Sequence, residues 1–236
     1  MEMIQRKGAL HPITATITTL TEVFNSFGYT LALGPELEDE YHNFDALNIP
    51  ADHPAREMQD TFWIKDRPGF VLRTHTSPMQ IRYMEQHAPP IRIVVPGKVF
   101  RNEATDATHE AQFHQLEGLC VSEDATLASL KGIIEAVLRH LFGDFVSVRY
   151  RPSFFPFTEP SLEVDMKLKE GGEWIEVLGC GMVHRQILSR VGIDCRRYSG
   201  FAFGMGIDRI VMLRHHLDDV RLLYKGDLQV VSQFLL

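Results

Sequence analysis

The sequence has few cysteines and no long apolar run. Its cysteines are Cys120, Cys180 and Cys195 alone, an odd number of widely spaced thiols without a Cys-x-x-Cys pair. We therefore expect free thiols rather than a disulfide framework or a structural zinc site. No apolar run reaches the roughly 18 residues of a membrane-spanning helix. Residues 1–12 also lack the apolar centre of a secretory signal. These absences predict a cytoplasmic protein with no membrane partner.

Positive charge is also scarce. The chain has 24 lysines and arginines against 31 aspartates and glutamates, which gives a formal net charge of −7. Proteins that hold nucleic acid by themselves usually carry a basic excess or a basic stripe. Here two arginines stand side by side only at Arg196 and Arg197. If this chain acts on a nucleic acid, we expect another domain or subunit to supply much of the contact.

What the sequence does contain is a pattern of helices near its ends and strands in its middle. Apolar spacing and cap residues predict helices over residues 11–27, 77–87, 124–142 and 206–217. Apolar runs and period-two alternation predict strands over residues 91–95, 113–121, 146–152, 162–168 and 173–179. The last three strands follow one another without a helix between them, and a Gly-Gly turn joins the final pair. The pattern predicts an α+β fold with a mainly antiparallel sheet.

One predicted strand carries three chemically different side chains on one face. Phe113, Gln115 and Glu117 are two residues apart, so they point the same way in an extended strand. The aromatic plane suits a purine ring, and the carboxylate suits a substrate ammonium group. Arg101 lies just before the preceding loop, where its fork of donors could hold a phosphate. The alternative is an ordinary polar sheet face.

An aromatic pair further along the chain suggests a pocket for a ring. Pro156 biases Phe155 towards an extended conformation, so Phe155 and Phe157 can share a face. Aromatic contacts with a third ring would add about 0.5–1.5 kcal/mol beyond area burial. The alternative is an aromatic pair in the core.

The motifs together resemble those of class II aminoacyl-tRNA synthetases. Residues 34–48 (GPELEDEYHNFDALN) resemble motif 1, residues 99–121 with FRNE resemble motif 2, and residues 200–213 (GFAFGMGIDRIVML) resemble motif 3. Within this class the sequence is similar to that of the alpha subunit of bacterial phenylalanyl-tRNA synthetase. The similar segments include LRTHTSPMQIR, RPSFFPFTEPS and GCGMVH. The resemblance runs from about residue 8 to the C-terminus. It implies a single class II catalytic domain over residues 1–236.

The resemblance also implies a role for each matching residue. Arg101 would hold the α-phosphate of ATP, and Arg209 would stack or pair near the γ-phosphate; both would be catalytic. Glu103, His109, Phe113 and Glu176 would complete the ATP site, with Phe113 under the adenine. The amino-acid site would consist of His75, Ser77, Gln115, Glu117, Phe155, Phe157 and Ala202. In it Gln115 and Glu117 would bind the α-ammonium group, and Ala202 would form the floor of the ring pocket.

A magnesium ion would accompany ATP, because its phosphates need one or two protein carboxylates to hold the metal. Glu159 matches a metal ligand of the family, and Glu176 is the second candidate. Glu163 and Asp165 share a strand face, which we interpret as an ordinary polar sheet face. The histidines do not have zinc spacing.

The implied reaction is the activation of L-phenylalanine with ATP to phenylalanyl-adenylate, followed by transfer to tRNA(Phe). The sequence begins just before the catalytic core, so we expect no N-terminal coiled-coil arm and expect the beta subunit to be a partner. Motif 1 forms a dimer interface in this class, which predicts a homodimer or an alpha–beta assembly. Asp208 stands where a glutamate is common before the motif 3 arginine. Two alternatives remain: a free-standing paralogue that serves a non-tRNA acceptor, and a non-catalytic binding or regulatory module.

Overall fold

The chain is built around one central sheet. The computed structural model describes residues 10–57 and 60–234. The helices are α1 (Pro12–Ser26), α2 (Glu40–Asn43), α3 (Pro78–Gln86), α4 (Leu127–Phe142), α5 (Arg185–Arg190), α6 (Ile207–His215) and α7 (Leu228–Val231). The strands are β1 (Thr30–Leu31), β2 (Leu37–Asp39), β3 (Phe70–Leu72), β4 (Ile91–Phe100), β5 (Gln112–Ser122), β6 (Ser147–Phe155), β7 (Thr158–Lys167), β8 (Ile175–Val183) and β9 (Ser199–Gly206). Short 3₁₀ turns occupy Asp45–Leu47, Pro54–Arg56 and Val220–Leu223.

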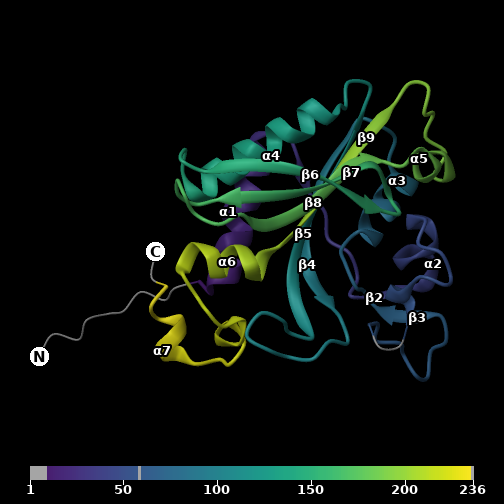
Figure 1. Cartoon of the computed structure of the whole chain (residues 1–236). Coiled ribbons are helices and arrows are strands. Elements are labelled where there is room, and N and C mark those ends of the chain that lie inside the picture. The colour runs from purple at the N-terminus through teal and green to yellow at the C-terminus, as the bar shows by residue number, and fades with distance from the viewer. Residues whose placement is uncertain (1–9, 58–59, 235–236) are drawn as a thin grey trace, which may run out of the picture.

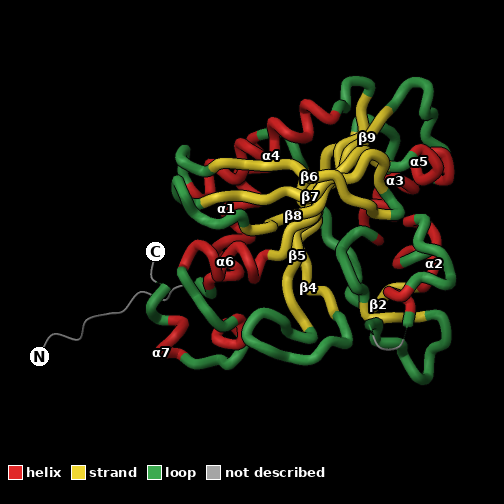
Figure 2. The backbone as a smooth tube through the Cα atoms, in the orientation of Figure 1, coloured by secondary structure: helices red, strands yellow, loops and turns green. Residues whose placement is uncertain are grey.

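The sheet has seven strands in the order β1-β4-β5-β9-β8-β7-β6, and β2 pairs separately with β3. Every pair in the large sheet is antiparallel except β1 with β4, which is parallel. The predicted α+β fold with a mainly antiparallel sheet is therefore confirmed. Figure 1 shows α1, α4 and α6 on one side of this sheet and α2, α3 and α5 on the other. Figure 2 shows the strands crossing the middle of the molecule between these groups.

Strand alternation sends side chains into two separate cores. On β4, Val94 packs into the core beneath α1, α4 and α6, whereas Ile93 and Val95 pack into the core beside α3 and α5. Both faces of this strand are buried, which explains why its sequence is a continuous apolar run. On β9, Phe203 lies in the first core, while Gly204 lies on the opposite face. The small residues of β9 thus leave space on one face only.

Several expected bounds needed correction; the strands expected over 162–168 and 173–179, for example, run over Thr158–Lys167 and Ile175–Val183. The strand expected over 91–95 continues to Phe100, and the strand expected over 146–152 continues to Phe155. The helix expected from residue 124 begins at Leu127, because the Thr126 side chain accepts a hydrogen bond from Ser129 N and caps it. Pro96 interrupts the apolar run, but the pairing of β4 with β5 continues to Phe100 and that of β6 with β7 continues to Phe155.

The segment that resembles motif 1 supports the loop after β3. The buried Asn43 side chain donates to Thr74 Oγ1 at 3.1 Å and accepts from Thr74 N at 3.3 Å. The buried Arg73 guanidinium donates to the carbonyls of Gly34, Pro35 and Lys98. These bonds satisfy backbone carbonyls that no strand partner reaches. They fix residues 73–77 between residues 34–43 and strand β4.

The expected free thiols are confirmed, since Cys120, Cys180 and Cys195 are all unpaired and the first two are buried. Within residues 10–57 and 60–234, no helix combines the length and apolar character that a membrane span requires.

We predict that Phe24→Ala strongly destabilises the fold. The Phe24 ring is 1% exposed, and its centroid lies 5.0 Å from that of Phe203 in a stacked pair. Removing such a buried ring typically costs about 3–5 kcal/mol. Urea unfolding followed by circular dichroism measures this loss. Phe145→Ala is the control, because Phe145 is 66% exposed; an equal loss in both variants would contradict the prediction.

Candidate active site

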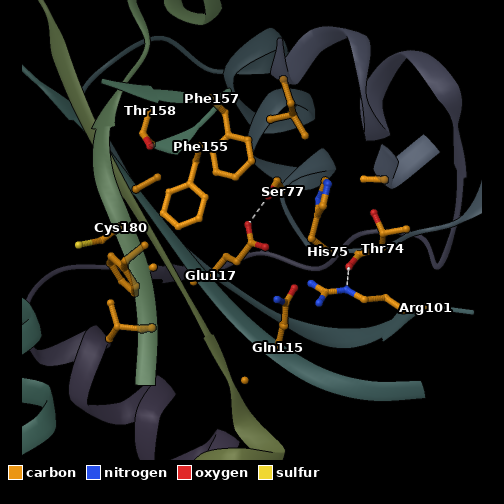
Figure 3. Close-up of a pocket in the computed structure, with 18 of the residues that line it drawn as sticks. Thr74, His75, Ser77, Arg101, Gln115, Glu117, Phe155, Phe157, Thr158 and Cys180 are labelled. Carbon is orange, nitrogen blue, oxygen red and sulfur yellow. Dashed lines mark hydrogen bonds between the residues drawn. The ribbon is translucent and has the colours of Figure 1, made fainter. Parts of the chain in front are cut away.

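A cavity of about 1050 Å³ lies on the face of the sheet that carries α3 and α5. Its volume slightly exceeds the range of about 300–1,000 Å³ for a single small ligand, so it has space for two small molecules. Figure 3 shows the rings of Phe155 and Phe157 on one side and the polar groups of Glu117, Gln115 and Arg101 on the other. The cavity therefore has an aromatic end and a polar end.

The polar end is organised around the buried carboxylate of Glu117, which is 5% exposed. It accepts hydrogen bonds from Thr76 N at 3.1 Å, Ser77 Oγ at 2.6 Å and Gln80 Nε2 at 2.7 Å. Burial raises the pKa of Glu117, and these three donors together with Arg73 oppose the rise. Ser77 stands at the N-cap of α3, but its hydroxyl does not cap the helix because it donates to Glu117 instead.

His75 lies beside this network with both ring nitrogens buried. Neither nitrogen has a hydrogen-bond partner among the described residues. Burial, followed by the nearby charges of Arg101 and Arg73, lowers the pKa of His75 to about 3. The ring is therefore neutral near pH 7 and offers one donor and one acceptor to a ligand.

Arg101 follows β4 and brings positive charge into the cavity. Its Nε donates to the carbonyl of Thr74 at 3.4 Å, and its guanidinium carbon lies 5.0 Å from the Phe113 ring centroid. Burial lowers the pKa of Arg101, but an arginine keeps its charge at neutral pH. The expected shared face of Phe113, Gln115 and Glu117 is confirmed, since all three line the cavity. The intervening His114 instead faces Asp208 and Tyr224.

The aromatic end is formed where β6 passes into β7. The Phe155 and Phe157 rings are nearly parallel, with centroids 5.8 Å apart and 6° between their planes, and both line the cavity. Phe155 lies so close to Gly179 that a Cβ at this glycine would stand 2.8 Å from the ring. Ala202 on β9 also lines the cavity. The aromatic pair thus lines a cavity instead of filling the core.

The residues expected at the nucleotide are spread over a loop and a helix. Glu103 and His109 line the cavity from the loop after β4, where Asp106 accepts from His109 N at 2.8 Å. Arg209, in the first turn of α6, also lines it and donates from Nε to the carbonyl of Glu176 at 3.0 Å. These residues reach the cavity together with Arg101 and Phe113.

The two expected metal ligands are not brought together. Glu176 lines the cavity, but Glu159 is not among the described residues that line it. The Glu159 carboxylate is 80% exposed and lies 3.4 Å from His184 Nε2. The reason is strand alternation, because the neighbouring Thr158 is buried and faces the cavity.

A second glutamate, Glu163, lines the cavity together with Glu176. The Glu163 carboxylate pairs with Arg151 at 2.9 Å, and Glu176 pairs with the same arginine at 3.3 Å. Glu163 and Asp165 both pair with Arg151, as expected for a polar sheet face, and Asp165 is buried against Arg149 and Arg151.

Sequence reasoning missed several cavity residues. Gln80 could have been found, because it lies three residues after Ser77 and so on the same face of α3. Thr158 adjoins the predicted Phe157. Phe44 and Leu47 come from the distant segment around the first 3₁₀ turn, and no local pattern marks them.

The chain matches a known protein family over almost its full length. The family described as tRNA synthetases class II core domain (F) matches residues 2–234. Among curated relatives, a phenylalanine–tRNA ligase alpha subunit from Synechocystis sp. is 52% identical over 97% of this chain and 68% of its own length. The alpha subunit from Marinomonas sp. is 54% identical over 98% of this chain and 70% of its own, and that from Psychrobacter arcticus is 53% identical over 97% and 64%. The chain therefore spans about two-thirds of the length of these relatives.

A solved structure shares the fold. The pyrrolysyl-tRNA synthetase from Desulfitobacterium hafniense superposes with a TM-score of 0.70, covering 91% of this chain and 74% of that one. Its sequence identity is 18%, so this likeness concerns the fold alone.

We predict that His75 makes the fold less stable as the pH falls below about 6.5, the ordinary value for histidine. The folded ring stays neutral down to about pH 3, whereas the unfolded chain takes up a proton. The unfolded state then binds more protons than the folded state. The free energy of unfolding therefore falls by up to about 1.4 kcal/mol for each unit by which the pH decreases. Urea unfolding between about pH 7 and 5 should show a shallower loss for His75→Gln than for the unsubstituted chain. Equal slopes would contradict this account.

Proposed function

Because the chain belongs to the family of phenylalanine–tRNA ligase alpha subunits, we propose that it activates L-phenylalanine with ATP to give phenylalanyl-adenylate. The observation that carries the proposal is the division of one cavity into an aromatic end and a polar end that leads to two arginines. A phenyl ring, an amino-acid backbone and a triphosphate require those three environments in that order.

The aromatic end would take the side chain of phenylalanine, between Phe155, Phe157 and the small Ala202. At the polar end, an ionised carboxylate has about four acceptor sites, of which three in Glu117 are already used. The remaining site would accept a hydrogen bond from the substrate α-ammonium group, assisted by Gln115. The neutral His75 and the Ser77 hydroxyl would meet the polar end of the amino acid.

The nucleotide would lie between the loop after β4 and the start of α6. Arg101 would contact the α-phosphate, and Arg209 the γ-phosphate end. Phe113 would lie against the adenine, with Glu103 and His109 at its edge. A carboxylate oxygen of phenylalanine would attack the α-phosphorus of ATP. The bond between the α-phosphorus and the oxygen that bridges it to the β-phosphate would break, and pyrophosphate would leave. The two arginines would stabilise charge that develops on the phosphates, without a covalent enzyme intermediate.

Members of this family generally use Mg²⁺ with ATP, and the cavity offers suitable donors. Glu176 and Glu163 both line the cavity, and Mg²⁺ sites typically use one or two carboxylates together with phosphate oxygens. We propose that Glu176, with Glu163, holds the ion. When bound, it would neutralise phosphate charge; Arg151, which bridges both carboxylates, keeps them close together.

The second step would pass the phenylalanyl group to the terminal ribose of tRNA(Phe), releasing AMP. We propose that residues 1–236 act as one catalytic domain and that a beta subunit contributes to tRNA binding, given the net charge of −7. The match to the class II core over residues 2–234 supports the single domain. A homodimer or an alpha–beta assembly, and a cytoplasmic location, stay predictions.

We predict phenylalanine-dependent exchange of pyrophosphate into ATP by this chain. Arg101→Ala should lower the exchange rate by about 10²–10³-fold, the usual effect of removing a donor to developing charge. Arg196→Ala is the matched control, because Arg196 is exposed and outside the cavity. A folded chain without exchange would contradict autonomous activation. Adding a beta subunit would then separate a dependent enzyme from a binding module.

A second prediction distinguishes the two candidate metal ligands. Glu176→Gln should raise severalfold the Mg²⁺ concentration that gives half-maximal exchange, because a cavity carboxylate is lost. Glu159→Gln should leave it unchanged, because Glu159 is 80% exposed and lies outside the cavity lining. If Glu159→Gln raised this Mg²⁺ concentration and Glu176→Gln did not, Glu159 would be the metal ligand.

A further inference from the structure

A short segment after α6 connects the two parts of the nucleotide site. We call residues 219–224 the brace; it contains the 3₁₀ turn Val220–Leu223 and ends at Tyr224. Val220 and Leu223 are 2% and 5% exposed, so the brace is packed into the core beneath the sheet. At its far end His11 Nε2 lies 3.0 Å from the carbonyl of Leu223.

The first connection runs from the brace to the loop after β4. Val220 N donates to the carbonyl of Ala107 at 2.8 Å. Ala107 lies in the part of this loop that carries Glu103 and His109, which are themselves exposed. Among its described residues the loop has internal bonds, such as Asp106 N to His109 O at 3.0 Å, but the Val220 bond ties it to a buried element.

The second connection runs from the brace to the start of α6. The Tyr224 hydroxyl donates to Asp208 Oδ1. Asp208 Oδ2 accepts from His114 N on β5 at 2.7 Å. His114 Nδ1 lies 3.1 Å from the same hydroxyl, and the His114 and Tyr224 rings are stacked at 6.3 Å with 10° between their planes. One carboxylate thus joins the brace, β5 and α6, directly before Arg209.

The charge on Asp208 depends on these donors. Its carboxylate is 5% exposed. Burial raises the pKa of Asp208, and the hydrogen bonds from Tyr224 and from His114 N oppose that rise. The Tyr224 hydroxyl therefore helps to hold a buried anion at the first turn of α6, where negative charge is favourable. Its loss would leave that carboxylate short of one donor and free to shift.

We propose that Tyr224 is a positioning residue for ATP. It is not among the described residues that line the cavity, so it acts through others. By holding Asp208 it fixes the direction of Arg209, and through Val220 the same brace holds the loop of Glu103 and His109. The aromatic end, formed where β6 passes into β7, makes no hydrogen bond to the brace within the described residues. This inference rests on the proposed function.

The test compares Tyr224→Phe with Tyr150→Phe by ATP–pyrophosphate exchange. Each substitution removes one half-buried hydroxyl with a hydrogen bond, but the Tyr150 hydroxyl donates to the carbonyl of Lys131 on α4, away from the cavity. We expect Tyr224→Phe to raise the KM for ATP about tenfold, as for one lost charge-assisted bond. The KM for phenylalanine should not change, and Tyr150→Phe should change neither constant.

A second readout does not require activity. Hydrogen exchange of the backbone amides in residues 101–111 should be faster in Tyr224→Phe than in the unsubstituted chain and in Tyr150→Phe. The proposal would be overturned if Tyr224→Phe changed neither the KM for ATP nor the hydrogen exchange of the amides in this loop. An equal rise in both KM values would also overturn it, because such a rise indicates a general loss of packing. If the unsubstituted chain lacks exchange activity, the proposed function fails, and the loop amides still decide whether the brace positions the loop.

Discussion

The buried carboxylate of Glu117 fastens the loop after β3 and the first turn of α3 to the central sheet. An unpaired carboxylate at this depth would be strongly unfavourable. Three donors from residues 76–80 compensate for its desolvation. The same bonds fix the direction of Ser77 and keep His75 in the wall of the cavity. The polar end is therefore preorganised by one charged group and the segment that surrounds it.

The antiparallel sheet gives this network its place. On β5, Glu117 and Gln115 share a face, while Leu116 and Cys120 pack beneath α1 and α4. On the neighbouring β9, large side chains such as Phe203 enter that same core, and Ala202 and Gly204 leave the other face open. A Cβ at Gly204 would approach Glu117 Cγ to 3.1 Å. Side-chain size on alternate positions thus separates a dense core from an open cavity.

Local patterns were sufficient for much of this arrangement. The period-two spacing of Phe113, Gln115 and Glu117 was enough to place them on one face, because alternation is a property of any extended strand. For Glu159 the expectation came from the family resemblance and not from spacing, and in the structure the neighbouring Thr158 occupies the inward position. Ser77 shows another limit. Its position predicts an N-cap, but a buried carboxylate from another strand competes for its hydroxyl and accepts the hydrogen bond.

The sequence by itself determined the fold class, the five strands β4 to β8, and the residue types at both ends of the cavity. These follow from local spacing and from motifs whose backbone geometry is set within a few residues. Only the tertiary structure decided which side chains meet. Glu163 and Glu176 share Arg151, and Tyr224 reaches Asp208, across strand pairings and chain reversals that no local pattern encodes. Such contacts depend on register and on the packing of distant elements, which are fixed only when the whole core forms.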